Sequence, residues 1–241
     1  MLAMKQSFLS LRKVGLESGA VLLAILLAFA IDAVWEERQE QERVQGYLSS
    51  LVFELSANRE LLQRNLDSIQ IYLRETEAYI VKVATASVES TSDQEVREMV
   101  YNMGPVPLQA VPLQHAALED LTSGSLQSIK DASLRRKILS YARTLEFDAL
   151  RQRRLEDWFS SQAGPYDEIH ADLVGMGASH LSGWAGRDDI RFEIDTAAFI
   201  GNRRYGNLLA SRALQLSRVI RAREQLLAEL EELQGALSSS D

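Results

Sequence analysis

The side chains with the clearest chemical potential are three histidines, because the chain contains no cysteine. The lack of cysteine excludes disulfides, thiolate zinc sites, iron–sulfur clusters and cysteine nucleophiles. His170 and His180 share a glycine-rich stretch with Asp188 and Asp189, where a loop could gather ligands for a divalent metal ion. Neither these histidines nor His115 belong to a helical i, i+4 metal-binding motif. We therefore expect a solvated loop there, with no metal and no cofactor.

Motifs for nucleophilic catalysis and phosphate binding are also missing from the sequence. No G-x-S-x-G motif follows a strand-like run, as a nucleophile elbow requires. Ser123-Gly124-Ser125 precedes a helical turn, and we expect it to end a helix. There is no P-loop, and Gly175-Met176-Gly177 lacks the third glycine of a dinucleotide-binding turn. The sequence therefore predicts no catalysis by this chain on its own.

Two carboxylates flank the most apolar stretch of the chain, Glu17 on one side and Asp32 on the other. An ionisable group inside a membrane segment is a functional candidate by default. In an oligomer, several copies of Glu17 could line an ion path. Both residues nevertheless lie near the ends of the stretch, where charge costs little, and Lys13 stands one turn from Glu17 as an ordinary partner. A subunit of an ion-conducting or ion-driven complex therefore remains an alternative function.

The stretch between these carboxylates has the length of a membrane span. Residues 14–34 read VGLESGAVLLAILLAFAIDAV, about 31 Å as a helix at 1.5 Å per residue, which matches a hydrocarbon core of about 30 Å. Trp35 follows at the position of an interfacial anchor. The residues before the span include Lys5, Arg12 and Lys13, whereas Glu36 and Glu37 open the acidic stretch after it. The positive-inside rule then places the N-terminus in the cytoplasm.

A cleaved signal peptide is the competing interpretation, with cleavage after Ala30 in the small-x-small run Ala28-Phe29-Ala30. A retained anchor is favoured because Glu17 interrupts the apolar core and the apolar pattern continues to Val34. The resulting topology is a cytoplasmic N-terminus at 1–13, a single transmembrane helix at 14–35 and an extracytoplasmic domain at 36–241. We expect this protein in a bacterial inner membrane.

Small residues line one side of the expected span. Gly15 and Gly19 form a GxxxG pair, and Ala20, Ala24 and Ala28 repeat at every fourth position. Such a stripe lets two helix backbones approach closely in lipid, although alanine and glycine are common in membrane helices anyway. The stripe favours a homo-oligomer.

Helical periodicity continues without a break after Trp35. No proline occurs between Met1 and Gly104, and apolar residues recur at steps of three and four as far as Val83. The simplest expectation is one helix from Val14 to about Ala86, on the order of 110 Å long at 1.5 Å per residue. Gly46 or the acidic stretch that follows the span could break it.

The rest of the chain also predicts helices and no strands. Ser92 or Asp93 is expected to cap a short helix, Gly124 to adopt a left-handed conformation at a helix end, and Asp131 to cap a long helix. The remaining expected elements are a short helix at 113–121, a long helix at 132–160, an irregular glycine-rich loop at 162–191 and a final helical region from Asp195 or Thr196 to near the C-terminus. The fold class is all-α, with three or four long helices in an antiparallel bundle.

Composition restricts the partners. With 34 acidic and 26 basic residues, the net charge is −8, which argues against a general nucleic-acid binder. Hydrophobic residues make up 46% of the 241 residues, so the chain can fold into one or two domains.

Two stretches resemble a family of bacterial single-pass membrane proteins catalogued only as a domain of unknown function. Residues 16–35 show a glutamate ahead of an Ile/Leu/Val/Ala span that ends in tryptophan. Residues 118–135, LEDLTSGSLQSIKDASLR, are similar to that family's mid-chain pattern, and the C-terminal helix with Phe199, Asn202 and Leu208 is a weaker match. The family often has asparagine where this chain has Asp32-Ala33-Val34, and the glycine-rich stretch here is longer. The resemblance implies a retained anchor and no activity.

These observations predict a membrane-anchored, self-associating interaction or assembly module. Its expected partners are the lipid bilayer, copies of itself or another membrane protein, and no nucleic acid. A second alternative is an extracytoplasmic metal-dependent enzyme or ligand sensor.

Overall fold

The computed structural model describes the backbone of residues 2–102, 111–170 and 194–239. Within these ranges, the side chains of residues 2–21, Ala24, Glu168 and Ile169 are not described. Every regular element across the described ranges is a helix. The all-α prediction is therefore confirmed for them.

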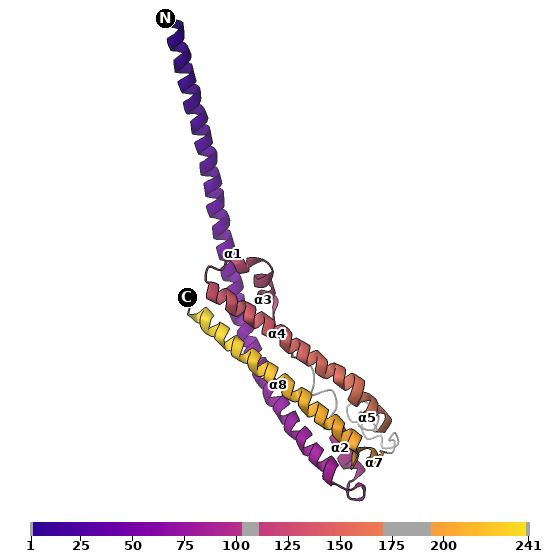
Figure 1. Ribbon diagram of the computed structural model, residues 1–241. Coiled ribbons are helices and arrows are strands. Elements are labelled where there is room, and N and C mark those ends of the chain that lie inside the picture. The colour runs from indigo at the N-terminus through magenta and orange to yellow at the C-terminus, as the bar shows by residue number, and fades with distance from the viewer. Residues whose placement is uncertain (1, 103–110, 171–193, 240–241) are drawn as a thin grey trace, which may run out of the picture.

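The first element, α1, is one continuous helix from Leu2 to Thr85. Its 84 residues correspond to about 126 Å at 1.5 Å per residue. Gly46 does not interrupt it, and a Cβ atom at this glycine would meet no other atom within 4 Å. From Leu22 onward, the first part of α1 projects away from the other helices (Figure 1), and Val44 is the first buried side chain along this stretch. The predicted long helix ending near residue 86 is confirmed.

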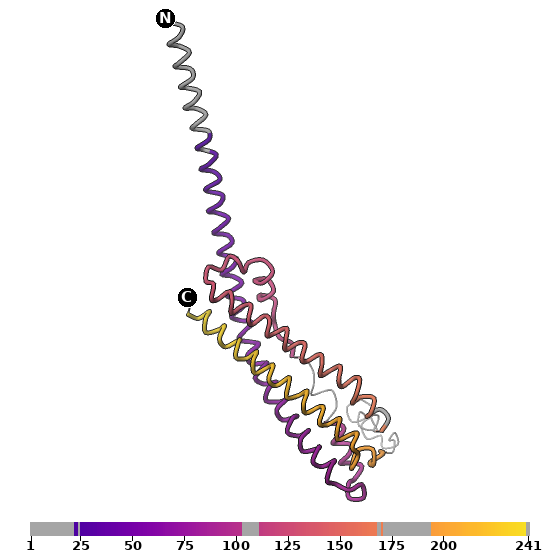
Figure 2. Tube along the Cα trace, viewed as in Figure 1, coloured from indigo at the N-terminus to yellow at the C-terminus, as the bar shows by residue number. Residues whose placement is uncertain are grey.

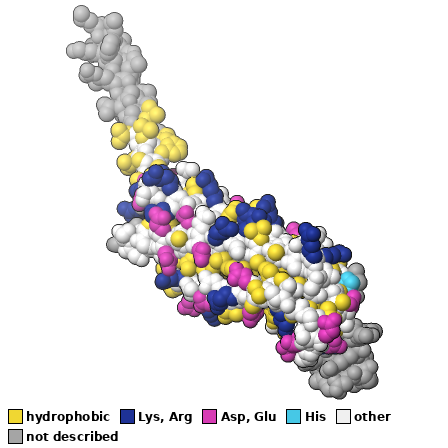
Figure 3. Space-filling view, turned by 60° about the horizontal axis from the view of Figure 1, so that its bottom comes forward, with side chains coloured by type: hydrophobic (Ala, Val, Ile, Leu, Met, Phe, Trp, Pro, Cys, Tyr) yellow, Lys and Arg dark blue, Asp and Glu magenta, His cyan; other side chains and the backbone are white. Residues whose placement is uncertain are grey.

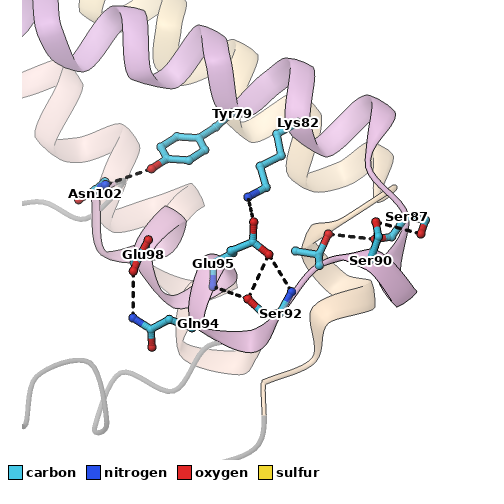
Figure 4. Close-up of polar contacts among 10 residues, drawn as sticks. Tyr79, Lys82, Ser87, Ser90, Ser92, Gln94, Glu95, Glu98 and Asn102 are labelled. Carbon is cyan, nitrogen blue, oxygen red and sulfur yellow. Dashed lines mark hydrogen bonds and ion pairs between the residues drawn. The ribbon is translucent and has the colours of Figure 1, made fainter.

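The turn after α1 leads through the short 3₁₀ helix η1 (Val88–Ser90) into α2 (Asp93–Asn102). Ser92 and Glu95 form a reciprocal capping box: the Ser92 amide donates to the Glu95 carboxylate at 2.9 Å, and the Glu95 amide donates to the Ser92 hydroxyl at 3.3 Å (Figure 4). Lys82 of α1 reaches the same carboxylate at 2.9 Å. The Ser92 amide, with further help from Lys82, lowers the pKa of Glu95 to about 2. Ser92 is therefore the cap that the sequence predicts.

The segment from α3 to the next long helix departs from the sequence prediction. Helix α3 (Ala116–Asp120) continues directly into a π-helical turn, η3 (Leu121–Ser125), and a 3₁₀ turn, η4 (Leu126–Ser128). The predicted left-handed cap at Gly124 is wrong. Among the described residues, a positive φ angle occurs at Gly201 and not at Gly124. Leu121 and Ser125 are buried on either side of Gly124, and their packing continues the right-handed turn through the glycine.

Helix α4 runs from Ala132 to Trp158, and the Asp131 carboxylate accepts a hydrogen bond from the Ser133 amide at 2.7 Å. This confirms the predicted cap. The chain then passes through a π-helical turn, η5 (Phe159–Ala163), into α5 (Gly164–His170). The expected irregular stretch at 162–191 is therefore helical at its start. Its remaining residues, from 171 onward, lie outside the described residues.

The final helical region is interrupted once. Helix α7 (Thr196–Phe199) begins after Asp195, where the sequence predicts the start of the final helical region, and the Asp195 carboxylate caps it. Gly201 then adopts a φ of +68°, a conformation that glycine reaches without a Cβ penalty. Asn202 caps α8 (Arg203–Ser238). The Gly201 amide donates to the Val83 carbonyl at 2.9 Å, which fixes this corner against the end of α1.

Three long helices, α1, α4 and α8, lie side by side (Figure 2). Helix α8 is antiparallel to α1, because its first turns contact Val83 whereas Gln234 near its end reaches Ser56. It is also antiparallel to α4, since Lys137 pairs with Glu232. Helix α8 therefore runs antiparallel to both of its neighbours.

Helices α1 and α4 run in the same direction, whereas the sequence predicts an antiparallel bundle. Lys130, just before α4, pairs with Glu37, and Tyr141 farther along α4 contacts Asn58. Asn102, at the end of α2, donates to the Tyr79 hydroxyl, whereas the Gln114 amide donates to Asn58. Tyr79 and Asn58 are 21 residues apart on α1, about 32 Å at 1.5 Å per residue.

The core consists of three clusters along the helices. The first, nearest the projecting part of α1, is mainly aliphatic, and so is the second, which contains Leu66, Ile69, Leu155 and Leu216. The third, at the far end, includes the aromatic residues Tyr166, Phe199 and Tyr205. The third cluster holds the short helices α2, α5 and α7 at the end of the molecule opposite the projecting helix.

Candidate functional site

The projecting part of α1 carries an uncovered apolar surface, here called the apolar sleeve. Its large side chains are 47% to 69% exposed and comprise Leu22, Leu23, Ile25, Leu26, Leu27, Phe29, Ile31, Val34 and Trp35. At 3.6 residues per turn these positions cover the whole circumference of the helix. Figure 3 shows the yellow sleeve standing above the charged surface of the domain. A surface of this kind marks a membrane or protein contact.

The sequence-predicted membrane residues fall in and before this sleeve. Ala28, Asp32 and Trp35 are exposed on the described part of the helix. The stripe and carboxylate positions at Gly15, Glu17, Gly19, Ala20 and Ala24 belong to α1, but their side chains lie outside the described ones. Across the residues that are described, none of the helices combines the length and hydropathy that a membrane crossing requires.

The sleeve ends where the domain begins. Soon after Trp35, Glu37 forms an ion pair with Lys130 at 3.4 Å, and Glu40 accepts a hydrogen bond from the Ser128 hydroxyl at 3.0 Å. These two contacts join the segment before α4 to α1. The change from apolar to charged residues in the sequence is therefore also the place where tertiary packing starts.

A buried ion pair lies halfway along the three long helices. Arg223 of α8 is fully buried, and its Nε lies 3.6 Å from Oδ1 of Asp148 on α4. Its other nitrogen atoms donate to the side-chain oxygens of Asn65 and Gln152. Burial raises the pKa of Asp148 and lowers that of Arg223, and the opposite charge of each partner works against the shift. The pair links all three long helices.

A second buried acid and base lie at the far end. Asp167 of α5 and Arg212 of α8 are 5% and 1% exposed. Burial raises the pKa of Asp167 to about 7, against the opposing effect of the Arg212 charge. Burial also lowers the pKa of Arg212 to about 10. The surroundings are aromatic: the rings of Tyr166 and Tyr205 stack at 5.6 Å, and the Tyr166 hydroxyl donates to the Ala198 carbonyl.

A groove of about 510 Å³ opens beside the buried ion pair. It lies between the segment of α3 with η3 and the face of α4, and Asp148, Gln152 and Arg223 contribute to its lining. The groove has the size of a small-molecule site. None of these residues was expected to form a site from the sequence.

The predicted metal ligands are only partly visible. His170 lies 3.5 Å from Asp195 through Nδ1 and Oδ2, whereas His180, Asp188 and Asp189 fall outside the described residues. His115 is exposed and pairs with Glu119 at 3.3 Å. Among the side chains described, no group of three or more acidic or histidine residues could hold a metal ion.

The buried pairs left a signal in the sequence that was missed. On α8 the buried side chains recur at steps of three and four: Tyr205, Leu209, Arg212, Leu216, Val219, Arg223, Leu226, Leu230, Leu233 and Leu237. Both arginines therefore occupy the phase of the apolar stripe. Asp148 and Gln152 do the same on α4. A charge in the apolar phase of a long amphipathic helix predicts a buried partner.

No family model, curated protein or solved structure matches the chain. The resemblance carried by residues 16–35 and 118–135 therefore stays a prediction.

Proposed function

We propose that this protein is a membrane-anchored interaction module. The first part of α1 lies in a lipid bilayer, and the helical domain stands on one side of the membrane, where it binds copies of itself or another membrane protein. The observation that carries this proposal is the apolar sleeve, which is exposed on all sides of the helix.

Energetics and geometry both favour lipid as the covering of the sleeve. Fully burying one large aliphatic or aromatic side chain is worth about 1.5–3 kcal/mol, so covering the sleeve is worth on the order of 10 kcal/mol. A single partner helix would cover one stripe, whereas lipid surrounds the whole circumference. The described sleeve extends from Leu22 to Trp35, and residues 14–21 would complete a span of normal length.

Charge supports the orientation. Lys5, Arg12 and Lys13 precede the span, and Glu36 and Glu37 follow it. The positive-inside rule places the N-terminus in the cytoplasm and the domain outside. For a bacterial protein this membrane is the inner membrane. The stripe from Gly15 to Ala28 supports close contact between two copies of the helix.

Membrane fractionation of the full-length protein tests the anchor. The wild type should stay in the membrane pellet after an alkaline carbonate wash. Leu23→Arg with Leu27→Arg should move most of the protein into the supernatant, because each arginine at mid-membrane costs about 2.5–3.5 kcal/mol. Ser49→Arg with Phe53→Arg is the matched control, since it adds the same charge to exposed positions of α1 within the domain. A sleeve variant that fractionates like the control contradicts the anchor.

The absence of cysteine makes the topology easy to measure. In intact cells, a membrane-impermeant maleimide should label Ser123→Cys but label Ser7→Cys only after permeabilisation. The opposite pattern would reverse the orientation. Equal labelling of both positions in intact cells would exclude a span.

Light scattering combined with intact mass spectrometry tests self-association. We expect a chain that begins at Met1 and forms a defined oligomer, and Gly15→Ile with Gly19→Ile should reduce the oligomer to a monomer. Ser7→Ile with Ser10→Ile serves as the control outside the stripe. A soluble monomer that begins at Ile31 would show that the segment is a cleaved signal peptide.

A further inference from the structure

Part of the lining of the groove beside the buried ion pair is apolar. Its apolar residues include Leu113, Leu118 of α3, and Ala142, Leu145 and Ala149 of α4. Its volume of about 510 Å³ suits a ligand with an apolar body of one or two rings. Thr122, in the π-helical turn η3, also lines the groove, and π-helical turns are frequent at functional sites.

The floor of the groove is polar and incompletely satisfied. Asp148 has a side chain only 7% exposed, and its Oδ1 accepts no hydrogen bond from any described residue. Arg223 Nε approaches this oxygen to 3.6 Å, which is too long for a hydrogen bond. The terminal nitrogens of Arg223 are already taken by Asn65 and Gln152. Among the described residues, the floor therefore holds one acceptor, Asp148 Oδ1, and one donor, Arg223 Nε, that lack a hydrogen-bond partner.

The charges around the groove favour a cation. Its acidic lining residues are Glu119, Glu146, Asp148 and Glu156, and its basic ones are Arg153 and Arg223. The charge of Arg223 is engaged by Asp148, so the remaining lining is predominantly acidic. These acidic side chains would repel an anionic ligand and attract an ammonium group.

We propose that this groove binds a small organic cation with an apolar body, of the arylalkylamine class. The apolar body lies between Leu118 and Leu145, and the ammonium group is held by the acidic lining that includes Glu146 and Glu156. The groove shares no residue with the apolar sleeve, so this inference is independent of the membrane proposal.

Isothermal titration calorimetry on the full-length protein in nanodiscs tests the proposal, with empty nanodiscs as the blank. Three probes share one ring system: 2-naphthylmethylamine, 2-naphthalenemethanol and 2-naphthoate. The amine should bind at least tenfold more tightly than the alcohol, and the carboxylate should show no binding. Absence of amine binding, or carboxylate binding at equal affinity, would overturn the proposal.

Two variants locate the binding site. Ala149→Trp fills the groove from an exposed position on α4 and should weaken amine binding at least tenfold. Glu146→Gln should weaken it severalfold and leave alcohol binding unchanged. Asp157→Asn is the matched control, because it removes a carboxylate from the same helix outside the groove. Equal effects of Glu146→Gln and Asp157→Asn would mean that only the overall charge matters, and this outcome also overturns the proposal.

Discussion

Helix α8 holds two buried arginines in two different surroundings. Arg223 lies among aliphatic side chains and is bound by Asp148, Asn65 and Gln152. Arg212, eleven residues earlier on the same face, lies near Asp167 among tyrosines. Eleven residues are close to three helical turns, so both arginines lie on the same face of α8.

The two acidic residues, Asp148 and Asp167, differ in the groups that surround their carboxyls. Asp167 titrates near pH 7 because burial outweighs the Arg212 charge. Asp148 faces a guanidinium whose two terminal nitrogens are held by carboxamides from α1 and α4. Burial raises the pKa of Asp148 as well, and the charge of Arg223 opposes that shift. Surroundings, rather than residue types, decide the behaviour of a buried charge.

The largest effect is expected at the middle pair. Arg223→Met should lower the free energy of unfolding by about 3–5 kcal/mol, because it leaves the Asp148 carboxylate buried without its partner. Asp148→Leu with Arg223→Met should recover most of that loss, since no buried charge remains. Urea denaturation followed by circular dichroism measures both. A double variant as unstable as Arg223→Met would show that the arginine acts through its bonds to Asn65 and Gln152.

A somewhat smaller effect is expected from pH at the far pair. Burial raises the pKa of Asp167 in the folded protein to about 7, from the ordinary value of 3.8 for this side chain. Folding therefore takes up a proton between these values, and the stability that this proton contributes is lost as the pH rises toward 7. Between pH 5 and pH 8 the wild type should lose about 3 kcal/mol relative to Asp167→Asn, at about 1.4 kcal/mol per pKa unit. Denaturation of both proteins across this range measures the two free energies of unfolding. Parallel dependence of these free energies on pH would show that the Asp167 carboxyl is exposed to water.

Removing Arg212 should have a pH-dependent cost. At low pH, Asp167 is already protonated and needs no counter-charge. In Arg212→Met the carboxyl keeps its proton to a higher pH, so the cost of the substitution should be about 1–2 kcal/mol larger at pH 8 than at pH 5.5. A cost that stays constant with pH would show that the Asp167 carboxyl does not respond to the charge of Arg212.

The smallest effects separate two tyrosines of the far cluster. The Tyr166 hydroxyl donates to the Ala198 carbonyl, and Tyr166→Phe should cost about 1 kcal/mol. The Tyr205 hydroxyl is buried and has no hydrogen-bond partner among the described residues, so Tyr205→Phe should be neutral or slightly stabilising. Thermal unfolding of the two variants side by side makes the comparison. A larger loss for Tyr205→Phe would indicate that its hydroxyl is hydrogen-bonded in solution.

Features that depend on neighbouring residues were readable from the sequence. The caps at Ser92 and Asp131 each involve a side chain and an amide two or three residues away. The uninterrupted α1 follows from the lack of proline before residue 105. The apolar sleeve was also expected, because an all-round apolar run cannot pack as one face of a helix.

Features that depend on distant residues required the tertiary structure. Helices α1 and α4 run in the same direction, because the chain contacts α1 at Tyr79 through Asn102 but at Asn58 through Gln114. No periodicity in the sequence encodes this arrangement. The groove and both buried pairs arise where three helices meet, so no single stretch contains them. By itself, the sequence determined the helices, their caps and the exposed apolar segment, because those rest on local hydrogen bonds and hydropathy. Only the tertiary structure decided which charges are buried and which residues share a pocket, because burial depends on packing between segments far apart in the chain.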